Sequence, residues 1–314
     1  MSRTIALTGA TGFIGGALAK HFIYTGWKVR ALVRPTSDRK RLNGINVHWV
    51  EGNLDDVESL RRLVHKAGAV VHCAGTVRGQ SEKQFNQVNV AGVARLVHAA
   101  VEQHPLPRFL LISSLAAREP HLSPYASSKR QGEQILAASC GEMPWTAFRP
   151  SAVYGPGDRE LLPLFRWVGR GIAPIIGSKD ARFSLLYVDD LAAAVRIWLE
   201  KSTQPGDVFE LHDGRPNGYS HRELIQIVAG MYSRRPLHIK IPAFLLNFLA
   251  VLNQTSAKAI GYQPMLTPGK VRELRHVNWV CDNQKLSRET GWKPQVPINE
   301  GLRRALFRGD PPEN

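Results

Sequence analysis

A glycine-rich turn near the beginning of the chain restricts the fold more than any other feature of the sequence. Residues 4–7 are apolar and typical of a strand, the letters TGATGFIGG follow at positions 8–16, and apolar residues then recur at helical spacing. In such a strand–turn–helix unit, glycines let the backbone approach a pyrophosphate, and the helix N-terminus offers it N–H groups. The sequence therefore predicts a dinucleotide-binding turn, although a glycine turn alone is more often an ordinary loop. Its cofactor-binding residues are expected to be Gly9, Thr11, Gly12, Phe13, Ile14 and Gly15.

Short apolar strands alternate with helices throughout the first half of the chain. The further strands are predicted at 28–33, 47–51, 69–72, 109–112 and 146–149, with a long helix over 82–102 and another from Tyr125 to about Ser139. This alternation is typical of an α/β protein with a Rossmann-type, doubly wound parallel sheet. Residues 182–188 and 208–211 are predicted to be strands that return to that sheet.

The pattern is looser after residue 155, and the length of the chain allows either one large α/β domain or a main domain with a smaller lobe, which the family resemblance described below implies to be a substrate lobe. We expect a dinucleotide-binding domain over 1–154, with returning segments near 182–212, and a lobe formed by 155–181 and 213–314. Helices are predicted near 160–170, 189–200, 221–232 and 243–252.

The longest apolar run, residues 241–252, lies in this lobe. It is too short to cross a bilayer, which needs roughly 20 apolar residues. We expect it to be a core or cleft-covering helix rather than an interfacial anchor, and a peripheral membrane contact stays open.

Charge and cysteine content narrow the class of protein. The net charge of +15 favours anionic ligands or surfaces, but the basic residues are scattered and lack a nucleic-acid signature, so a solvated basic surface is expected and no nucleic-acid partner. Cys73, Cys140 and Cys281 lack metal-ligand spacing, so we expect reduced thiols, no metal site and a cytoplasmic protein. A strand begins within four residues of the start, which predicts that no signal peptide precedes it.

The residue that closes the second strand bears on the choice of cofactor. Arg34 lies about 20 residues beyond the glycine turn, where an acidic residue would bind the ribose 2′-hydroxyl of NAD. Its guanidinium suits a 2′-phosphate instead, so NADP is favoured, NAD stays open, and Arg39 is a second candidate contact. The alternative is a surface arginine. Asn53, followed by Leu54, is placed either to meet the adenine or to serve as a turn residue.

Small residues and a polar residue further along are also expected near the cofactor. The buried strand 69–72 ends in Cys73-Ala74-Gly75, where small side chains leave room for a cofactor beside the backbone. Asn89 lies inside the long helix predicted over 82–102, where asparagine is locally unfavourable. A buried polar role for Asn89 is plausible on this ground, with an exposed asparagine as the alternative.

Tyr125 and Lys129 are four residues apart at the start of a helix and therefore share one face. A cationic lysine beside a tyrosine lowers the pKa of the phenol from about 10, so that the tyrosine acts as a general acid or base. A serine of the pair Ser113-Ser114, at the end of the neighbouring strand, is placed to hydrogen-bond a substrate oxygen. A surface pair is the alternative.

The motifs TGATGFIGG, YASSK, RPSAVYGPGD, YVDDLAAA and DNQKLSRETGWKP occur in this order between residues 8 and 294. This set resembles the extended short-chain dehydrogenase/reductases, which include NAD-dependent epimerase/dehydratases, 3β-hydroxysteroid dehydrogenases and dihydroflavonol reductases. The resemblance implies a catalytic set of Tyr125, Lys129 and a serine, for which Ser114 fits better than Ser113. It also implies that Asn89 lies behind the lysine and that the backbone from Pro150 to Val153 meets the nicotinamide.

Departures from the family pattern narrow the reaction. Leu115-Ala116 follow Ser114 where sugar-nucleotide dehydratases resemble one another in an Asp-Glu pair, so dehydration is disfavoured. Epimerases tend to carry an arginine seven residues before the aspartate that matches Asp190, a position that Phe183 occupies here. Arg182 is one residue away, and on a strand such a shift turns the side chain to the other face. Of the lobe's apolar residues, Leu161, Leu162, Phe165, Trp167 and 244–252, most are expected in the core and some in the cleft.

These observations predict an NADP-dependent oxidoreductase that transfers a hydride between nicotinamide and a carbonyl or secondary alcohol of a fairly apolar small molecule. The alternatives are a nucleotide-sugar epimerase that retains its NAD(P) and, in a different class, a non-catalytic dinucleotide-binding subunit. The partner is a small-molecule substrate, and a homodimer stays open.

Overall fold

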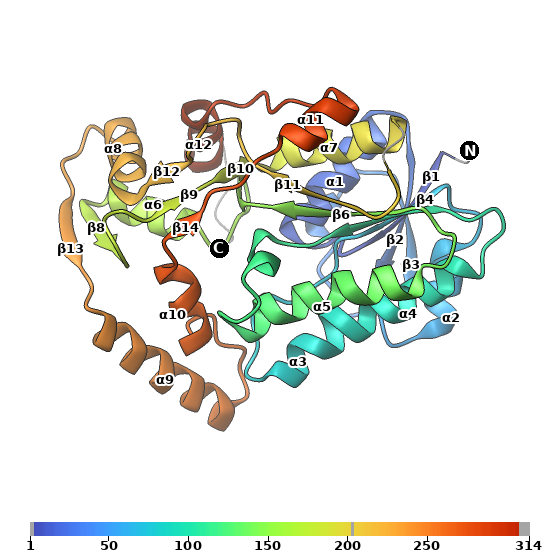
Figure 1. Cartoon of the computed structure of the whole chain (residues 1–314), viewed down its shortest axis with the longest axis horizontal. Coiled ribbons are helices and arrows are strands. Elements are labelled where there is room, and N and C mark those ends of the chain that lie inside the picture. Colours follow the sequence, from blue (N-terminus) through green and yellow to red (C-terminus); the bar gives the residue numbers. More distant parts are fainter. Residues whose placement is uncertain (1–2, 202–203, 308–314) are drawn as a thin grey trace.

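The computed structural model describes residues 3–201 and 204–307, and a seven-stranded sheet forms its centre (Figure 1). The strands are β1 (Thr4–Thr8), β2 (Lys28–Val33), β3 (Val47–Glu51), β4 (Ala69–His72), β5 (Arg108–Ile112), β6 (Trp145–Pro150) and β11 (Asp207–Leu211). Their order is β11-β6-β5-β4-β1-β2-β3, and every neighbouring pair is parallel. The predicted Rossmann-type parallel sheet is therefore confirmed.

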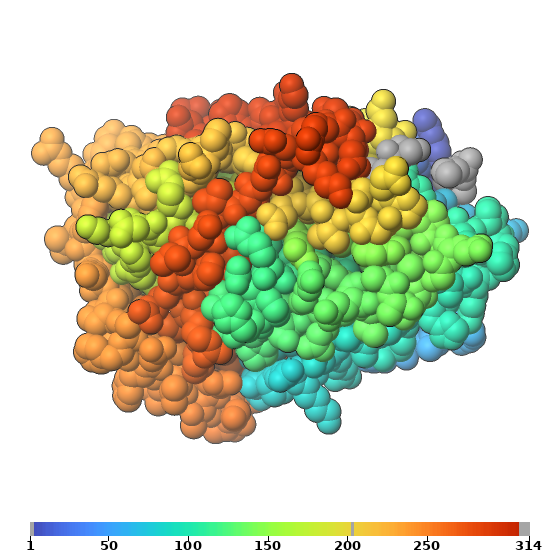
Figure 2. All heavy atoms as spheres, viewed as in Figure 1, coloured from blue at the N-terminus to red at the C-terminus, as the bar shows by residue number. Residues whose placement is uncertain are grey.

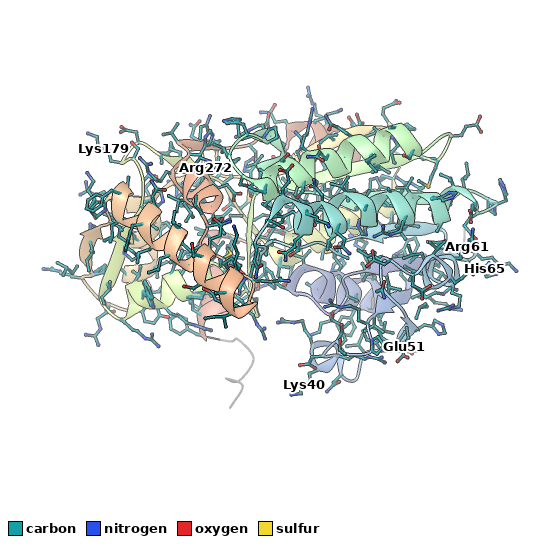
Figure 3. All side chains as sticks on the ribbon, turned by 90° about the horizontal axis from the view of Figure 1, so that it is seen from below. Lys40, Glu51, Arg61, His65, Lys179 and Arg272 are labelled. Atoms are coloured by element: carbon teal, nitrogen blue, oxygen red, sulfur yellow. The ribbon has the colours of Figure 1, made fainter. Side chains whose placement is uncertain are left out.

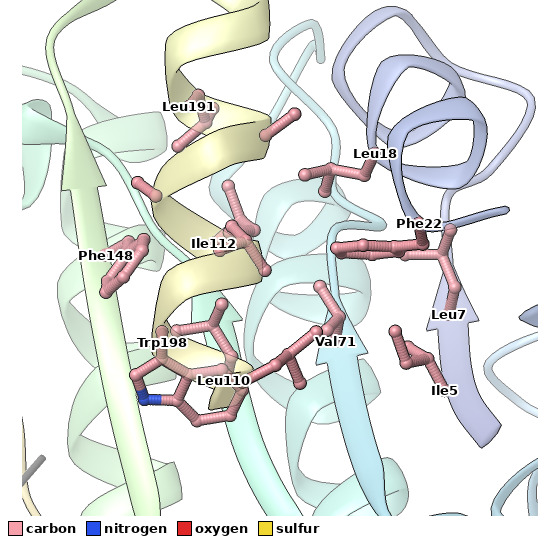
Figure 4. Packing of buried hydrophobic residues seen from close by; sticks show 14 of the residues in the cluster. Ile5, Leu7, Leu18, Phe22, Val71, Leu110, Ile112, Phe148, Leu191 and Trp198 are labelled. Atoms are coloured by element: carbon pink, nitrogen blue, oxygen red, sulfur yellow. The ribbon is translucent and has the colours of Figure 1, made fainter. Parts of the chain in front are cut away.

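Helices cover both faces of this sheet because successive strand residues point to opposite sides. In β1, Ile5 and Leu7 pack with α1 (Phe13–Tyr24) and α7 (Val188–Glu200), whereas Ala6 belongs to the core on the other face. That second core is formed with α2 (Val57–Val64), α4 (Gly92–Val101) and α5 (Pro124–Ser139). Figure 4 shows Leu18 and Phe22 of α1, with Leu191 and Trp198 of α7, packed over the strands.

The long helix predicted over 82–102 is present, with an irregular segment in its middle. It consists of α3 (Glu82–Asn86), a π-helical segment (Gln87–Ala91) and α4. Asn89 lies in the π-helical segment and is buried, with 4% of its surface exposed. Single π turns inside α-helices are frequent at functional sites. The expected buried role of Asn89 is therefore confirmed.

A smaller lobe lies beside the sheet and has its own hydrophobic core (Figure 1). Its elements are β7 (Ala152–Tyr154), α6 (Leu162–Gly169), β8 (Ile172–Ile175), β9 (Arg182–Phe183), β10 (Leu185–Tyr187), β12 (Tyr219–Ser220), α8 (His221–Met231), β13 (Leu237–Lys240), α9 (Ala243–Ile260), α10 (Pro268–Arg275), β14 (Asn278–Trp279) and α12 (Ile298–Phe307). Helix α11 (Gln284–Thr290) returns to the main sheet, where Leu286 joins the core. Figure 2 shows the segment that contains α10 and β14 (orange-red) lying across the junction of the two parts.

One prediction about the sheet is wrong. Residues 182–188 do not return to it, because β10 pairs with β7 and β9 pairs with β12 and β14 in separate small sheets. The outer edge of β6 is already occupied by β11, so no second strand fits there. The predicted return of 208–211 is confirmed, and α7 brings the chain back onto α1.

Helix α9 also departs from expectation. Only Leu246, Ala250 and Ala257 are buried in it, and the apolar run forms neither a core helix nor part of the cleft lining. The expectation of a core or cleft-covering helix fails because a single narrow stripe of α9 packs against the rest of the lobe. Within the described residues, no helix combines the length and hydrophobicity needed to traverse a bilayer.

Candidate functional site

A cleft of about 1290 Å³ lies between the carboxyl ends of the sheet strands and the lobe. We name its two sides the cofactor wall, formed by lining residues from Gly9 to Val153, and the lobe wall, formed by lining residues from Gly157 to Trp279. The predicted site residues that line the cleft are Gly9, Thr11, Gly12, Phe13, Ile14, Gly15, Arg34, Gly75, Asn89, Ser114, Tyr125, Lys129, Pro150 and Val153. The cleft thus brings together most of the residues singled out in the sequence.

The glycine turn fits a dinucleotide because it leaves no room for side chains. A Cβ on Gly15 would lie 2.1 Å from the Gly9 carbonyl oxygen, and Gly9 itself has a φ of +76°. A Cβ on Gly9 would lie 2.7 Å from the backbone nitrogen of Ala74. No side chain caps α1 at Gly12, so the first helical turn directs uncapped backbone N–H groups toward the cleft. This cradle suits a pyrophosphate.

Basic side chains line the cleft next to this turn. Arg34 follows β2 and is exposed, and Lys20, Lys40 and Arg41 line the same region. Arg41 reaches across to the beginning of the lobe, where its Nη2 donates to the Gly157 carbonyl oxygen at 3.4 Å. Arg39 instead pairs with Glu51 at 2.7 Å and does not line the cleft. Of the two arginines considered from the sequence, Arg34 is the one placed at the cleft.

Three residues expected to bind the cofactor do not line the cleft: Asn53, Leu54 and Ala74. The Asn53 side-chain oxygen accepts from the backbone of Asp55 at 2.7 Å, so Asn53 has the turn role. Leu54 packs against Gly92, where an added Cβ would lie 2.9 Å from Leu54 Cδ1. The backbone N–H of Ala74 donates to Thr8 Oγ1 at 3.1 Å, which holds the end of β4 against the glycine turn.

Asn89 fixes the geometry around the lysine. Its Oδ1 accepts from the backbone of Thr76 at 2.9 Å, and its Nδ2 donates to the Thr76 carbonyl oxygen and to Ser128 Oγ at 2.9 Å. A Cβ on Gly75 would lie 3.1 Å from Asn89 Oδ1 and 3.9 Å from Lys129 Nζ. Asn89 thus joins the loop after β4 to helix α5, directly beside the lysine.

The start of α5 holds the candidate catalytic side chains. Ser123 caps this helix and Pro124 occupies its first turn, a pairing that favours helix initiation. Tyr125 is hydrogen-bonded to Ser114, which follows β5. Lys129 Nζ donates to the carbonyl oxygen of Ile112 at 2.8 Å. Ser114, Tyr125 and Lys129 therefore meet at the carboxyl end of β5.

Ser113 has a different environment from Ser114. Its hydroxyl donates to the buried carboxylate of Glu133, which also accepts two hydrogen bonds from Arg149 at 2.9 and 2.6 Å. Glu133 and Arg149 are both buried, and the charge of each is compensated by the other. The contacts favour Ser114 over Ser113 as the serine that meets a substrate, because Ser113 is engaged away from Tyr125.

The ionisation of the tyrosine differs from what the sequence predicts. Burial raises the pKa of the Tyr125 phenol to about 12, the hydrogen bond with Ser114 lowers it, and the nearby Glu273 carboxylate raises it. Burial also lowers the pKa of the Lys129 ammonium to about 8. The expected lowering of the tyrosine pKa by the lysine is wrong for this structure, because desolvation of the phenolate is the largest effect and Lys129 is not among the groups that shift this pKa. Tyr125 is therefore protonated at neutral pH.

The lobe wall is mainly apolar. Its apolar lining residues include Leu161, Leu164, Phe165, Phe183, Leu185, Leu224, Ile225, Val228 and Trp279. Of the other lobe residues considered from the sequence, Leu162 is in the core and Trp167 is 48% exposed.

The strand register of β9 separates two neighbouring residues. Phe183 lines the cleft, whereas Arg182 donates to the Asn217 carbonyl oxygen at 2.6 Å and pairs with Glu223 at 3.2 Å. The one-residue shift thus turns the arginine away from the cleft.

Several cleft residues were not singled out from the sequence. Arg41 is one of the basic residues that we assigned to a solvated surface, and Glu273, His221 and Lys270 gave no local signal. Glu273 on α10 accepts a hydrogen bond from Ser123 and is paired with Lys270 at 2.9 Å. This contact holds α10 against the start of α5 beside Tyr125. No group of His, Cys, Asp and Glu side chains in the described segments is arranged to hold a metal ion.

Comparisons with known proteins agree with this geometry. A model of the NAD dependent epimerase/dehydratase family matches residues 5–211. The chain is 34% identical over 276 residues to a ceramide reductase from Caulobacter vibrioides, covering 88% of this chain and 85% of the relative. It is 28% identical over 330 residues to a 2-alkyl-3-oxoalkanoate reductase from Stenotrophomonas maltophilia, covering 96% and 97%. The structure of UDP-glucose 4-epimerase from Thermotoga maritima, solved with UDP-glucose, has a TM-score of 0.76 and 22% identity over 97% of this chain and 98% of that one. This last likeness concerns the fold.

Proposed function

The chain belongs to the NAD-dependent epimerase/dehydratase family of extended short-chain dehydrogenase/reductases, and from this premise we propose that it is an NADP-dependent reductase of an apolar ketone. As a member it is an NAD(P)-dependent enzyme. The proposal concerns which cofactor it prefers, which direction it favours and which substrates it accepts.

One observation carries the proposal: the hydrogen-bonded pair Ser114 and Tyr125, with Lys129 beside it, faces a cleft whose far wall is apolar. A carbonyl oxygen held by Ser114 and Tyr125 would leave the rest of a substrate against residues such as Phe183 and Leu224. An apolar molecule gains free energy there by leaving water. A charged diphosphate gains no such free energy from these apolar side chains.

A protonated Tyr125 is suited to be the proton donor in the reduction of a ketone. With its pKa raised to about 12, the phenol carries its proton at neutral pH. Tyr125 can therefore donate that proton to the oxygen that becomes an alcohol, and Ser114 stabilises the same oxygen by a hydrogen bond. Bound NADPH would supply the hydride to the carbonyl carbon. Lys129 would hold the ribose of the cofactor.

Charge in the cofactor wall supports NADP over NAD. Arg34 closes β2 where an acidic side chain would favour NAD, and Lys40 and Arg41 add positive charge to the same part of the cleft. Asp38, the acidic residue nearest to them in the sequence, accepts from the backbone of Lys40 at 2.8 Å. A 2′-phosphate would meet donors here.

The substrate class follows from the lobe wall and from the relatives. The names ceramide reductase and 2-alkyl-3-oxoalkanoate reductase describe reductions of lipids or alkyl-chain compounds. We propose that this chain reduces a ketone on a lipid-like molecule of this kind. The orientation of Arg182 away from the cleft removes one basic partner that the diphosphate of a nucleotide sugar would use.

The test is an assay of the purified protein with NADPH and two substrate sets, long-chain ketones and nucleotide sugars. We expect net NADPH consumption with a long-chain ketone and none with a nucleotide sugar. Interconversion of nucleotide sugars without net change in nicotinamide absorbance would contradict the proposal. The protein would instead be a non-catalytic binding subunit under two conditions. It would bind NADPH without consuming it with either substrate set, and Tyr125→Phe would leave NADPH binding and the biological activity unchanged.

A further inference from the structure

Helix α9 presents an unusual outer surface, which we name the α9 face and define by Phe244, Leu245, Phe248, Leu249, Val251 and Leu252. The exposed fraction is 75% for Phe244 and 64% for Phe248, and none of the six is buried. They fall on two adjacent helical stripes, opposite the inward stripe of Leu246, Ala250 and Ala257. Single exposed apolar residues are ordinary, but a continuous apolar helix face marks an interaction surface.

Hydrogen bonds and apolar contacts attach α9 to the loop after β4 and to the rest of the lobe. Gln80, in the loop after β4, donates from its side-chain Nε2 to the carbonyl oxygens of Ala257 at 2.8 Å and Tyr262 at 2.7 Å. The backbone carbonyl oxygen of Gln80 accepts from the side chain of Gln254 at 3.1 Å. The inward residues pack on Val271 of α10 and on Ile176, which lines the cleft. The α9 face is therefore held in a fixed position beside the cleft.

The charge around this face identifies its partner. Residues 224–272 contain no Asp or Glu and carry six basic residues, Arg234, Arg235, Lys240, Lys258, Lys270 and Arg272, of which Lys270 is paired with Glu273 and Arg272 donates to the Leu122 carbonyl oxygen. The first three precede α9 and are exposed, and exposed Lys258 lies near its other end. Figure 3, seen from below, shows α9 along the near face of the lobe, with Arg272 labelled on the same half of the molecule.

From these observations we propose that the α9 face docks on an anionic lipid bilayer. An apolar helix face in a stretch of sequence that has basic residues and no Asp or Glu matches a helix that lies in the membrane interface, where apolar side chains enter the acyl boundary and basic groups meet anionic headgroups. A second copy of this chain fits poorly, because two such faces would bring basic segments together in a protein of net charge +15.

The position of the face gives the docking a consequence. The segment that follows α9 reaches the cleft at Met265, and Ile176 touches both the cleft and the core beneath α9. A bilayer bound at the α9 face would therefore lie close to the lobe wall. Docking on a bilayer involves no catalytic step, so it can be tested independently of the proposed reductase activity.

The experiment is flotation of the full-length protein with two kinds of vesicle, phosphatidylcholine alone and phosphatidylcholine mixed with phosphatidylglycerol. We expect binding to the mixed vesicles that exceeds binding to the neutral ones and weakens with salt. Phe244→Glu should reduce the partition about tenfold or more, because it removes one inserted aromatic side chain. Lys240→Ala should reduce it about fivefold.

Tyr24→Glu is the matched control, because Tyr24 is 74% exposed on α1 and belongs to the other part of the molecule. It should bind vesicles as the unmodified protein does. Unfolding temperatures confirm that each variant is folded. Equal vesicle binding by Phe244→Glu, or no binding by the unmodified protein, would overturn the proposal. So would a solution dimer that becomes monomeric in Phe244→Glu, since the face would then be an interface between copies.

Discussion

The two walls of the cleft are built in different ways. The cofactor wall depends on backbone: Gly9 and Gly15 leave no room for a Cβ, and the candidate catalytic groups are placed by the end of β5 and the first turns of α5. The lobe wall depends on side chains from distant segments, such as Phe183, Leu224 and Trp279. Backbone constraints fix a common cofactor, whereas exchangeable side chains set the substrate. We therefore expect changes in the cofactor wall to affect every substrate alike and changes in the lobe wall to affect selectivity.

Removal of the Tyr125 hydroxyl should have the largest effect. Tyr125→Phe should lower the rate of ketone reduction about 10³-fold, because it removes the phenol that donates the proton beside Ser114. NADPH affinity should stay within about twofold of the unmodified protein, because the ring remains. Steady-state kinetics and fluorescence titration measure the two quantities.

Tyr154→Phe is the control for that change. The Tyr154 hydroxyl is buried and has no hydrogen-bond partner among the described residues, so its loss should leave the rate unchanged. If Tyr125→Phe kept most of the activity, the catalytic role assigned to the cofactor wall would be wrong.

A methyl group in the glycine turn should have the next largest effect, on stability. Gly15→Ala places a Cβ 2.1 Å from the Gly9 carbonyl oxygen, so the strand and helix must separate. We expect a loss of about 3 kcal/mol in the free energy of unfolding, with weaker NADPH binding. In α8, Gly230→Ala meets no atom within 4 Å and should stabilise the protein by about 1 kcal/mol. Equal urea denaturation curves for the two variants would contradict a backbone-limited cofactor wall.

Charge reversal at the end of β2 should change cofactor preference. Arg34→Glu should weaken NADPH binding by about 2 kcal/mol, roughly thirtyfold, and leave NADH binding almost unchanged, because only NADPH carries the 2′-phosphate. Arg39→Glu is the matched control, since Arg39 is already paired with Glu51 away from the cleft. Isothermal titration with both nucleotides measures the difference. Equal losses in the two variants would show that only the overall charge matters.

A cavity in the lobe wall should weaken substrate binding and leave cofactor binding unchanged. Leu224→Ala removes apolar contact from the cleft and should raise the KM of a long-chain ketone about tenfold. The affinity for NADPH should not change, because Leu224 lies on the wall opposite the glycine turn. A parallel loss of NADPH affinity would show that the two walls are not independent.

The smallest effect concerns pH. Because burial lowers the pKa of Lys129 to about 8, its ammonium loses its proton as the pH rises through that value. NADPH affinity should therefore fall about fivefold between about pH 7 and about pH 9, as a charged donor becomes a neutral one. Lys129→Arg should remove this dependence, because the guanidinium stays charged. A flat profile in the unmodified protein would separate the lysine from cofactor binding.

The sequence was most informative where structure is local. The strand–turn–helix at residues 8–16 and the spacing of Tyr125 and Lys129 depend on neighbours within a few residues, so patterning sufficed to predict them. Alternating elements also predicted the parallel sheet. The buried role of Asn89 was considered because asparagine is locally unfavourable inside a helix, and the structure confirms it.

Long-range packing limited the rest. The pairing of β10 with β7 depends on β11 already occupying β6, and the exposure of α9 depends on how little of the lobe lies behind it. The pKa of Tyr125 depends on burial by distant segments, including Glu273 of α10. None of these conditions is visible in a local pattern.

The central claim is that NADPH transfers a hydride to a ketone on a lipid-like molecule. NADPH deuterated at the transferable position tests it directly, with the product alcohol examined by mass spectrometry. The account predicts one deuterium in the alcohol for each NADP+ released, and about 10³-fold slower formation of this labelled product with Tyr125→Phe. The claim would be contradicted if no long-chain ketone gave a labelled alcohol, while nucleotide sugars were interconverted without label and without release of NADP+.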